Sequence, residues 1–100
     1  MTDSVSQVIV LSNATFSVGR LVATPKVLAS VSNDEILRSL CRHVHGDWGD
    51  LDKEDWAANN RALAKCGRLF SVYNSSQGVR FWIITEHDRS ATTVLLPEDY

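Results

Sequence analysis

The last third of the chain alternates apolar and polar residues with a period of two, and this pattern constrains the fold more than any other feature. Three such stretches run over Arg68 to Tyr73, Val79 to Glu86 and Thr92 to Leu96. A period of two is typical of β-strands, and the short connections favour antiparallel pairing. The sequence therefore predicts an antiparallel meander. Its middle strand is apolar on both faces and is expected to be the central one.

The first third of the chain predicts further strand and helix. Phe16 to Ala23 is rich in β-branched and apolar residues and predicts a strand, and Val8 to Leu11 is a second, shorter candidate. Thr24-Pro25 is typical of a helix start and predicts a short helix through Ser30. Residues 1–7 are polar and are expected to be frayed.

Two longer helices are predicted between the first strand and the meander. Residues 32–35, Ser-Asn-Asp-Glu, have the spacing of a capping box, and apolar residues at helical spacing follow until Gly46. Asp52 is expected to cap the next helix, and Gly67 is expected to end it in the left-handed conformation. The middle of this helix holds two asparagines, Asn59 and Asn60. Both are poor helix formers, so we expect them to bond to loop backbone or to a neighbouring element.

The size of the chain allows one hydrophobic core. It has 100 residues, of which 44% are hydrophobic, and this is too little apolar material for two cores. We therefore expect a single domain over residues 1–100. Its predicted class is α+β, with an antiparallel sheet of three to four strands packed by two or three helices. An exposed edge strand would favour a homodimer, whereas a charged or covered edge would prevent one, so both states stay open.

Composition and charge narrow the classes of partner and compartment. The net charge is −2 and the ten basic residues are scattered singly, so no global field attracts a polyanion. No apolar run approaches the ~20 residues that cross a bilayer. Cys41 and Cys66 form no C-x-x-C motif, and the sequence shows no secretory signal. We expect a cytoplasmic protein without membrane contact.

Residues 46 to 56, GDWGDLDKEDW, contain two tryptophans and five acids. The candidate binding residues of this acidic loop are Asp47, Trp48, Asp50 and Asp52. In a structural interpretation, one aspartate caps the following helix and the first tryptophan folds back over the core. In a functional interpretation, tryptophan and clustered carboxylates form a docking patch for a basic partner.

A second group of candidate residues lies in the turn between the last two strands. Glu86, Asp88 and Arg89 follow one another closely there. They could serve a small metal-dependent hydrolase or nuclease, although neighbours in a tight turn diverge. In the structural interpretation, Asp88 accepts backbone N–H groups and Arg89 pairs with Asp47 or Asp50.

Metal and cofactor sites find little support in the sequence. His43 and His45 lie two apart on a predicted helix, where their side chains point in different directions. We expect His43 to pack at the rim of the core. The acidic loop lacks the ligand spacing of an EF-hand. We expect no metal and no cofactor. Weak nucleic-acid binding, by arginines gathered on the sheet with Tyr73 and Phe81, is a further alternative.

Two stretches of the chain, GDWGDLDKEDWAANNRAL and WIITEHDRSATTVLLPEDY, resemble the landmark stretches of a family of small, largely uncharacterised bacterial proteins found on plasmids and other mobile elements. The resemblance runs from about Phe16 to the C-terminus, and Trp56 and His87 depart from the family pattern. It implies a genomic setting and no mechanism. The leading expectation is a non-catalytic accessory protein that binds another macromolecule, chiefly a protein such as a host defence factor, through the acidic loop.

Overall fold

The computed structural model describes residues 13–100. The strand predicted at Val8 to Leu11 and the fraying predicted for residues 1–7 lie outside the described part of the chain. In chain order the elements are β1 (Arg20–Ala23), α2 (Pro25–Ser30), α3 (Asn33–Val44), α4 (Lys53–Ala64), β2 (Leu69–Asn74), β3 (Arg80–Thr85), β4 (Ala91–Leu95) and the 3-10 helix η1 (Pro97–Asp99).

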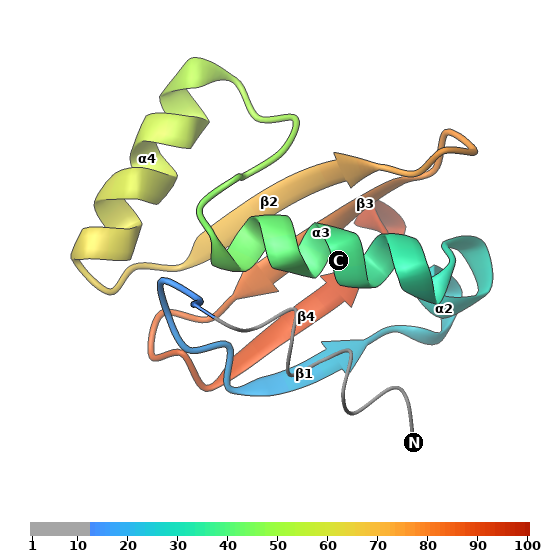
Figure 1. Cartoon of the computed structure of the whole chain (residues 1–100), viewed down its shortest axis with the longest axis horizontal. Coiled ribbons are helices and arrows are strands. Elements are labelled where there is room, and N and C mark those ends of the chain that lie inside the picture. The colour runs from blue at the N-terminus through green and yellow to red at the C-terminus, as the bar shows by residue number, and fades with distance from the viewer. Residues whose placement is uncertain (1–12) are drawn as a thin grey trace.

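The four strands form one mixed sheet in the order β1-β4-β3-β2 (Figure 1). The meander β2-β3-β4 is antiparallel, as the period-two pattern predicts, and β3 lies inside the sheet. The prediction of an antiparallel sheet is wrong for β1, which pairs with β4 in parallel. Two parallel strands that pair need a long crossover connection. Between β1 and β4 the segment from α2 through β3 supplies it. The α+β class holds, with three α-helices in the described chain.

The helix starts follow the predicted capping residues. Thr24, Ser32 and Asp52 are the N-caps of α2, α3 and α4, and each side-chain oxygen accepts a hydrogen bond from a backbone N–H three residues later. The second half of the predicted capping box is wrong. The carboxylate of Glu35 accepts a bond from the N–H of Ser76 at 2.7 Å, and so it ties α3 to the β2–β3 turn.

The end of α4 differs from the prediction by one residue. Cys66, rather than Gly67, is left-handed, with φ of 58°. Gly67 matters for a different reason, because a Cβ there would lie 2.8 Å from Cβ of Ala62. A small residue is therefore required for the chain to pass close to the last turn of α4.

The two faces of the sheet are covered differently. Helices α2 and α3 pack on one face, which we call the covered face (Figure 1). Its buried core contains Val27, Val31, Ile36, Leu40, Tyr73, Phe81, Ile83, Val94 and Leu96. Side chains at the alternate strand positions point to the other face, which we call the open face. Within residues 13–100 no α-helix lies across the open face, which is bordered by the first turn of α4 and by Tyr100 after η1.

The outer edge of β2 is closed by its own chain. The N–H of Val72 donates to the carbonyl of Trp48 at 3.1 Å, and its carbonyl accepts from the N–H of Asp50 at 2.7 Å. Next along the edge, the side-chain amide of Asn59 bonds to both backbone groups of Phe70. These contacts use the hydrogen-bonding groups that an added strand would need. The other edge of the described sheet is β1.

Gly49 makes this edge contact possible. Its φ is 76°, and a Cβ at this position would lie 2.0 Å from the carbonyl oxygen of Val72. Only glycine combines that left-handed conformation with so close an approach.

The described residues contain no helix with the length and apolar character needed to cross a membrane.

Candidate functional site

Trp48, the central residue of the acidic loop, belongs to the covered face. Its side chain has no exposed surface. The indole packs against Phe16 and His43, with ring centroids at 6.3 and 5.5 Å, and its Nε1 donates to Oδ1 of Asn60 at 3.0 Å. The indole fills space between α3, α4 and β2, so a docking surface must be built from other side chains.

The acids on either side of Trp48 have arginine partners. Asp47 accepts two hydrogen bonds from the Arg42 guanidinium, at 2.7 and 3.2 Å. The bond from Arg42 is the main reason why the pKa of Asp47 lies below its usual value. Asp50 accepts from Arg80 at 2.9 Å and from Asn74 at 3.3 Å. Both carboxylates therefore tie the acidic loop to α3 and to the β2–β3 hairpin.

Glu86 and Asp88 do not converge on a common point. Glu86 lies 3.5 Å from Nε of Arg68 in an exposed ion pair. Oδ1 of Asp88 accepts the N–H of Ser90 at 3.0 Å, as the turn interpretation predicts. Hydrogen bonds from Ser90 lower the pKa of Asp88. Within residues 13–100 no group of three or more His, Cys, Asp and Glu side chains is arranged to hold a metal ion.

The predicted pairing of Arg89 with Asp47 or Asp50 is wrong. The guanidinium donates to the carbonyls of Gly67 at 2.6 Å and of Glu86 at 3.1 Å. It also lies 5.6 Å from the ring centroid of Phe16. Arg89 itself is left-handed, with φ of 61°. The side chain therefore joins the end of α4 to the β3–β4 turn.

A buried hydrogen-bonded chain centred on His43 joins α3 to three strands. His43 is fully buried on the covered face. Its Nδ1 lies 2.5 Å from Oγ of Ser71 and its Nε2 lies 2.9 Å from Oγ1 of Thr85. Thr85 then contacts Oγ1 of Thr92 at 2.7 Å, and Thr92 donates to the carbonyl of Val18 at 2.8 Å. Sequence reasoning placed His43 only at the rim of the core.

The direction of this chain fixes the tautomer of His43. Because Thr92 uses its only proton on a carbonyl, it must accept from Thr85, which must in turn accept from Nε2–H of the imidazole. Nδ1 is then the acceptor for the hydroxyl of Ser71. The ring is neutral in this arrangement. Burial, with a smaller contribution from Arg89, lowers the pKa of His43 to about 3.

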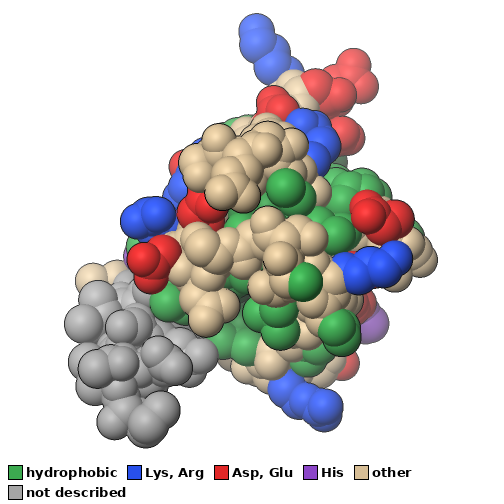
Figure 2. All heavy atoms as spheres, turned by 90° about the vertical axis from the view of Figure 1, so that its right-hand side faces the viewer, with side chains coloured by type: hydrophobic (Ala, Val, Ile, Leu, Met, Phe, Trp, Pro, Cys, Tyr) green, Lys and Arg blue, Asp and Glu red, His purple; other side chains and the backbone are tan. Residues whose placement is uncertain are grey.

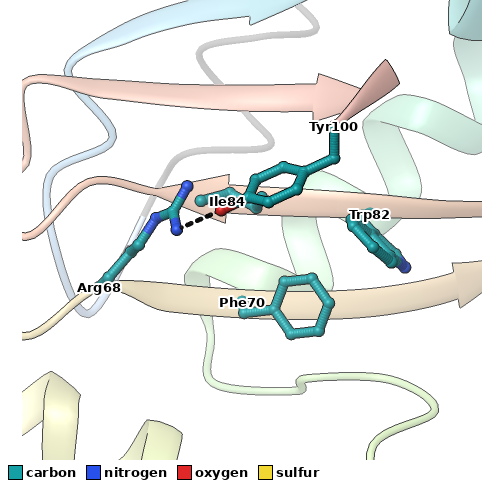
Figure 3. Close-up of a pocket in the computed structure, with 5 residues that line it drawn as sticks. All are labelled: Arg68, Phe70, Trp82, Ile84 and Tyr100. Carbon is teal, nitrogen blue, oxygen red and sulfur yellow. Dashed lines mark hydrogen bonds between the residues drawn. The ribbon is translucent and has the colours of Figure 1, made fainter. Parts of the chain in front are cut away.

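The open face carries a pocket of about 280 Å³, which we call the aromatic pocket. Its lining residues are Arg68, Phe70, Trp82, Ile84 and Tyr100. Figure 3 shows the rings of Phe70 and Trp82 side by side on neighbouring strands, and the Tyr100 ring reaching back toward Arg68. Arg68 donates to the Tyr100 hydroxyl at 2.8 Å. The three rings meet edge to face, with Phe70–Trp82 and Trp82–Tyr100 centroids at 5.0 and 5.8 Å.

A shallower hollow, which we call the acidic depression, adjoins the aromatic pocket. Its lining residues are Asp50, Leu51, Asp52, Asp55, Phe70, Val72, Arg80 and Trp82. The depression contains three carboxylates, those of Asp50, Asp52 and Asp55, and one guanidinium, that of Arg80. Arg80 already pairs with Asp50. Within residues 13–100 neither Asp52 nor Asp55 forms an ion pair. On the face shown in Figure 2, acidic and basic side chains are interspersed.

Sequence reasoning missed the aromatic residues of the open face. The proposed nucleic-acid platform of Tyr73 and Phe81 is wrong, because both rings are buried on the covered face. One signal was present: in VRFWIITE both faces of the strand are apolar, and Trp82 alternates with Phe81 and Ile83.

Comparison of the chain with protein-family models, with curated proteins and with solved structures finds no match. The function of the site is therefore inferred from its own side chains.

Proposed function

We propose that this chain is a non-catalytic binding protein whose open face receives a basic segment of another protein. The observation that carries the proposal is the acidic depression, where half-buried Phe70 and Trp82 lie beside three carboxylates and one arginine. Aromatic rings and carboxylates together favour a Lys or Arg side chain, which stacks on the ring and pairs with the acid. The role on a mobile element, or against a host defence factor, rests on the sequence resemblance alone.

The acids of the depression differ in their availability to a partner. Asp50 already pairs with Arg80. Asp52 uses one oxygen to cap α4, accepting from the N–H of Asp55 at 2.8 Å, and keeps its negative charge for a ligand. Asp52 and Asp55 are therefore the residues that we assign to the basic side chain of the partner. Trp82 takes the role that the sequence suggested for Trp48.

The hydrolase alternative has weaker support. Arg89 is bonded to backbone carbonyls, Asp88 to the turn and Glu86 to Arg68, so these three side chains are engaged separately. A general acid or base must reach a shared substrate atom together with its partners. We therefore retain the binding role as the proposed function.

Titration with short peptides tests the proposal. The probe is an acetylated and amidated pentapeptide, GRGAG, and the readout is the NMR shift of the Trp82 indole N–H. Trp48 is the internal reference because it is fully buried on the other side of the sheet. The double substitution Asp52→Asn with Asp55→Asn should weaken binding roughly fivefold through the loss of two exposed charge contacts. Asparagine remains a good N-cap, so α4 should stay intact.

A matched control removes the same charge elsewhere. Asp34→Asn with Glu54→Gln also neutralises two acids, and neither residue lines the acidic depression. This variant should bind the peptide nearly as well as the unchanged protein. Equal loss in both variants would reduce the effect to net charge and overturn the proposal. Tighter binding of an acidic peptide, or of an oligothymidine at the same salt concentration, would also overturn it.

A further inference from the structure

We infer that the partner's segment carries an aromatic side chain two residues from its basic one, and that this ring enters the aromatic pocket. The inference rests on the proposed function and specifies the partner's sequence pattern. It is carried by the shape and chemistry of the aromatic pocket, and by the way in which the two hollows share their walls.

The aromatic pocket is built for an apolar ring. Phe70, Trp82 and Tyr100 supply walls at steep angles, with interplanar angles of 75° and 67° between successive rings. Ile84 lies beneath the Tyr100 ring in Figure 3. Edge-to-face contacts of this kind favour a further aromatic guest over an aliphatic one.

The charge in the aromatic pocket is already balanced. Arg68 lies 3.5 Å from the carboxylate of Glu86 and donates to the Tyr100 hydroxyl. Its guanidinium also lies 5.5 Å from the centroid of the Tyr100 ring. A neutral guest leaves these contacts in place, whereas an additional cation would be repelled by Arg68. The basic side chain of the partner therefore belongs in the acidic depression and the ring in the aromatic pocket.

The positions of the two hollows along the strands set the spacing. Both are lined by Phe70 and Trp82, which are diagonal neighbours on β2 and β3. Phe70 is paired with Ile84, and Trp82 is paired with Val72. The aromatic pocket extends from this pair toward Arg68, and the acidic depression extends the other way toward Val72. The centres are thus separated by about two residues along β2. An extended peptide presents residues i and i+2 on one face, about 6.6 Å apart, so a basic residue and an aromatic one with a single residue between them fit the pair of hollows.

Three peptides of matched length test the pattern. GRGFG has the predicted spacing, GRGAG lacks the ring, and GRFGG has the same composition as GRGFG with the ring one position nearer. GRGFG should bind about fivefold more tightly than either of the others. Shifts in Trp82 and Tyr100, with Trp48 unchanged, would place it on the open face.

Substitution of Tyr100 distinguishes the pocket from a general affinity for rings. Tyr100 is 70% exposed, so its replacement should leave the fold intact. Tyr100→Ala removes one wall and should abolish most of the advantage of GRGFG over GRGAG. Tyr100→Phe keeps the ring, loses the bond from Arg68, and should retain the advantage.

The outcomes separate the two proposals. If GRGFG, GRFGG and GRGAG bind equally while the Asp52→Asn with Asp55→Asn variant still weakens all three, the spacing pattern is overturned and the basic-segment proposal stands. If no peptide binds, both fall. Tighter binding of a single nucleotide than of GRGFG in the aromatic pocket would also overturn the pattern, because the guest would then be a nucleobase.

Discussion

The covered face and the open face of the sheet contain similar side chains in different surroundings. Both carry a tryptophan in contact with other rings: Trp48 with His43 and Phe16, and Trp82 with Phe70 and Tyr100. Trp48 is fully buried and its N–H is satisfied by Asn60, whereas Trp82 is half-buried in the wall of a pocket. The first arrangement stabilises the fold. The second leaves aromatic surface available to a ligand.

Polar groups differ between the faces in the same way. On the covered face, His43 and three hydroxyls form a closed chain that ends on a backbone carbonyl. On the open face, Asp52 and Asp55 border an aromatic hollow and form no ion pair within the described residues. Closed networks contribute to specificity of packing, and open charges contribute to recognition.

Removal of the two tryptophans should separate the faces most clearly. Trp48→Ala deletes a fully buried ring and should lower the free energy of unfolding by about 3–5 kcal/mol. Trp82→Ala should lower it by only about 1–2 kcal/mol, because the ring is partly hydrated already. Urea denaturation followed by circular dichroism measures both. Equal losses would contradict the distinction between a structural face and a binding face.

Acidification should act on the covered face through His43. Its pKa is about 3 in the folded protein and 6.5 in the unfolded chain. Below pH 6.5 the unfolded chain therefore binds a proton that the folded protein does not. Stability is fully present above pH 6.5 and falls as pH drops toward 3, by about 2 kcal/mol between pH 6.5 and 5.

His43→Gln provides the control for this pH dependence, because glutamine retains a donor and an acceptor and does not titrate. The variant should be less stable at neutral pH, yet its free energy of unfolding should change by about 2 kcal/mol less between pH 6.5 and 5. Urea denaturation at several pH values measures this change. If the free energy of unfolding of the variant fell between pH 6.5 and 5 as much as that of the unchanged protein, other groups would account for the acid sensitivity.

The closed edge of β2 should contribute an intermediate amount to the free energy of unfolding. Asn59→Ala removes both side-chain bonds to the backbone of Phe70 and should cost about 1–3 kcal/mol. Hydrogen exchange at the Phe70 amide should accelerate in the same variant. Asn60→Ala removes one bond, to Trp48, from an exposed position and should cost less. The reverse order would show that the Trp48 contact, and not the edge, anchors α4.

The smallest loss of unfolding free energy is expected from the exposed ion pair between Asp47 and Arg42. Asp47→Asn weakens an ion pair with Arg42 in which both side chains are about half exposed, 50% for Arg42 and 44% for Asp47. Solvent and salt screen such pairs, so the loss in unfolding free energy should stay below about 1 kcal/mol. It should shrink further in 1 M salt. A loss that does not depend on salt would point to the Asp47–Gly49 hydrogen bond instead.

The sequence alone predicted the local structure accurately. Thr24, Ser32 and Asp52 begin helices because their oxygens accept nearby N–H groups, and this requires only neighbouring residues. The three meander strands follow from alternation and short turns. The sequence also predicted that the mid-helix asparagines bond to other elements, and Asn59 and Asn60 do so.

Long-range pairing was not readable in the same way. The parallel alignment of β1 with β4 joins residues about seventy positions apart, and no local pattern encodes its direction. The burial of Trp48 agrees with the structural interpretation of the acidic loop, but the sequence left the docking interpretation open because the neighbours of Trp48 are acids and glycines, which are typical of surface loops. The aromatic pocket depends on Phe70, Trp82 and Tyr100 meeting from separate elements. Arg89 found carbonyls at the end of α4 that sequence proximity does not reveal.

The amino-acid sequence by itself determined the helices, the meander and the concentration of acids before α4, because capping, periodicity and turn chemistry act between near neighbours. Tertiary structure alone decided which tryptophan is buried and which lines a pocket. Trp48 and Trp82 are the same residue type, and their different roles arise from the helices that pack on one face of the sheet and leave the other open.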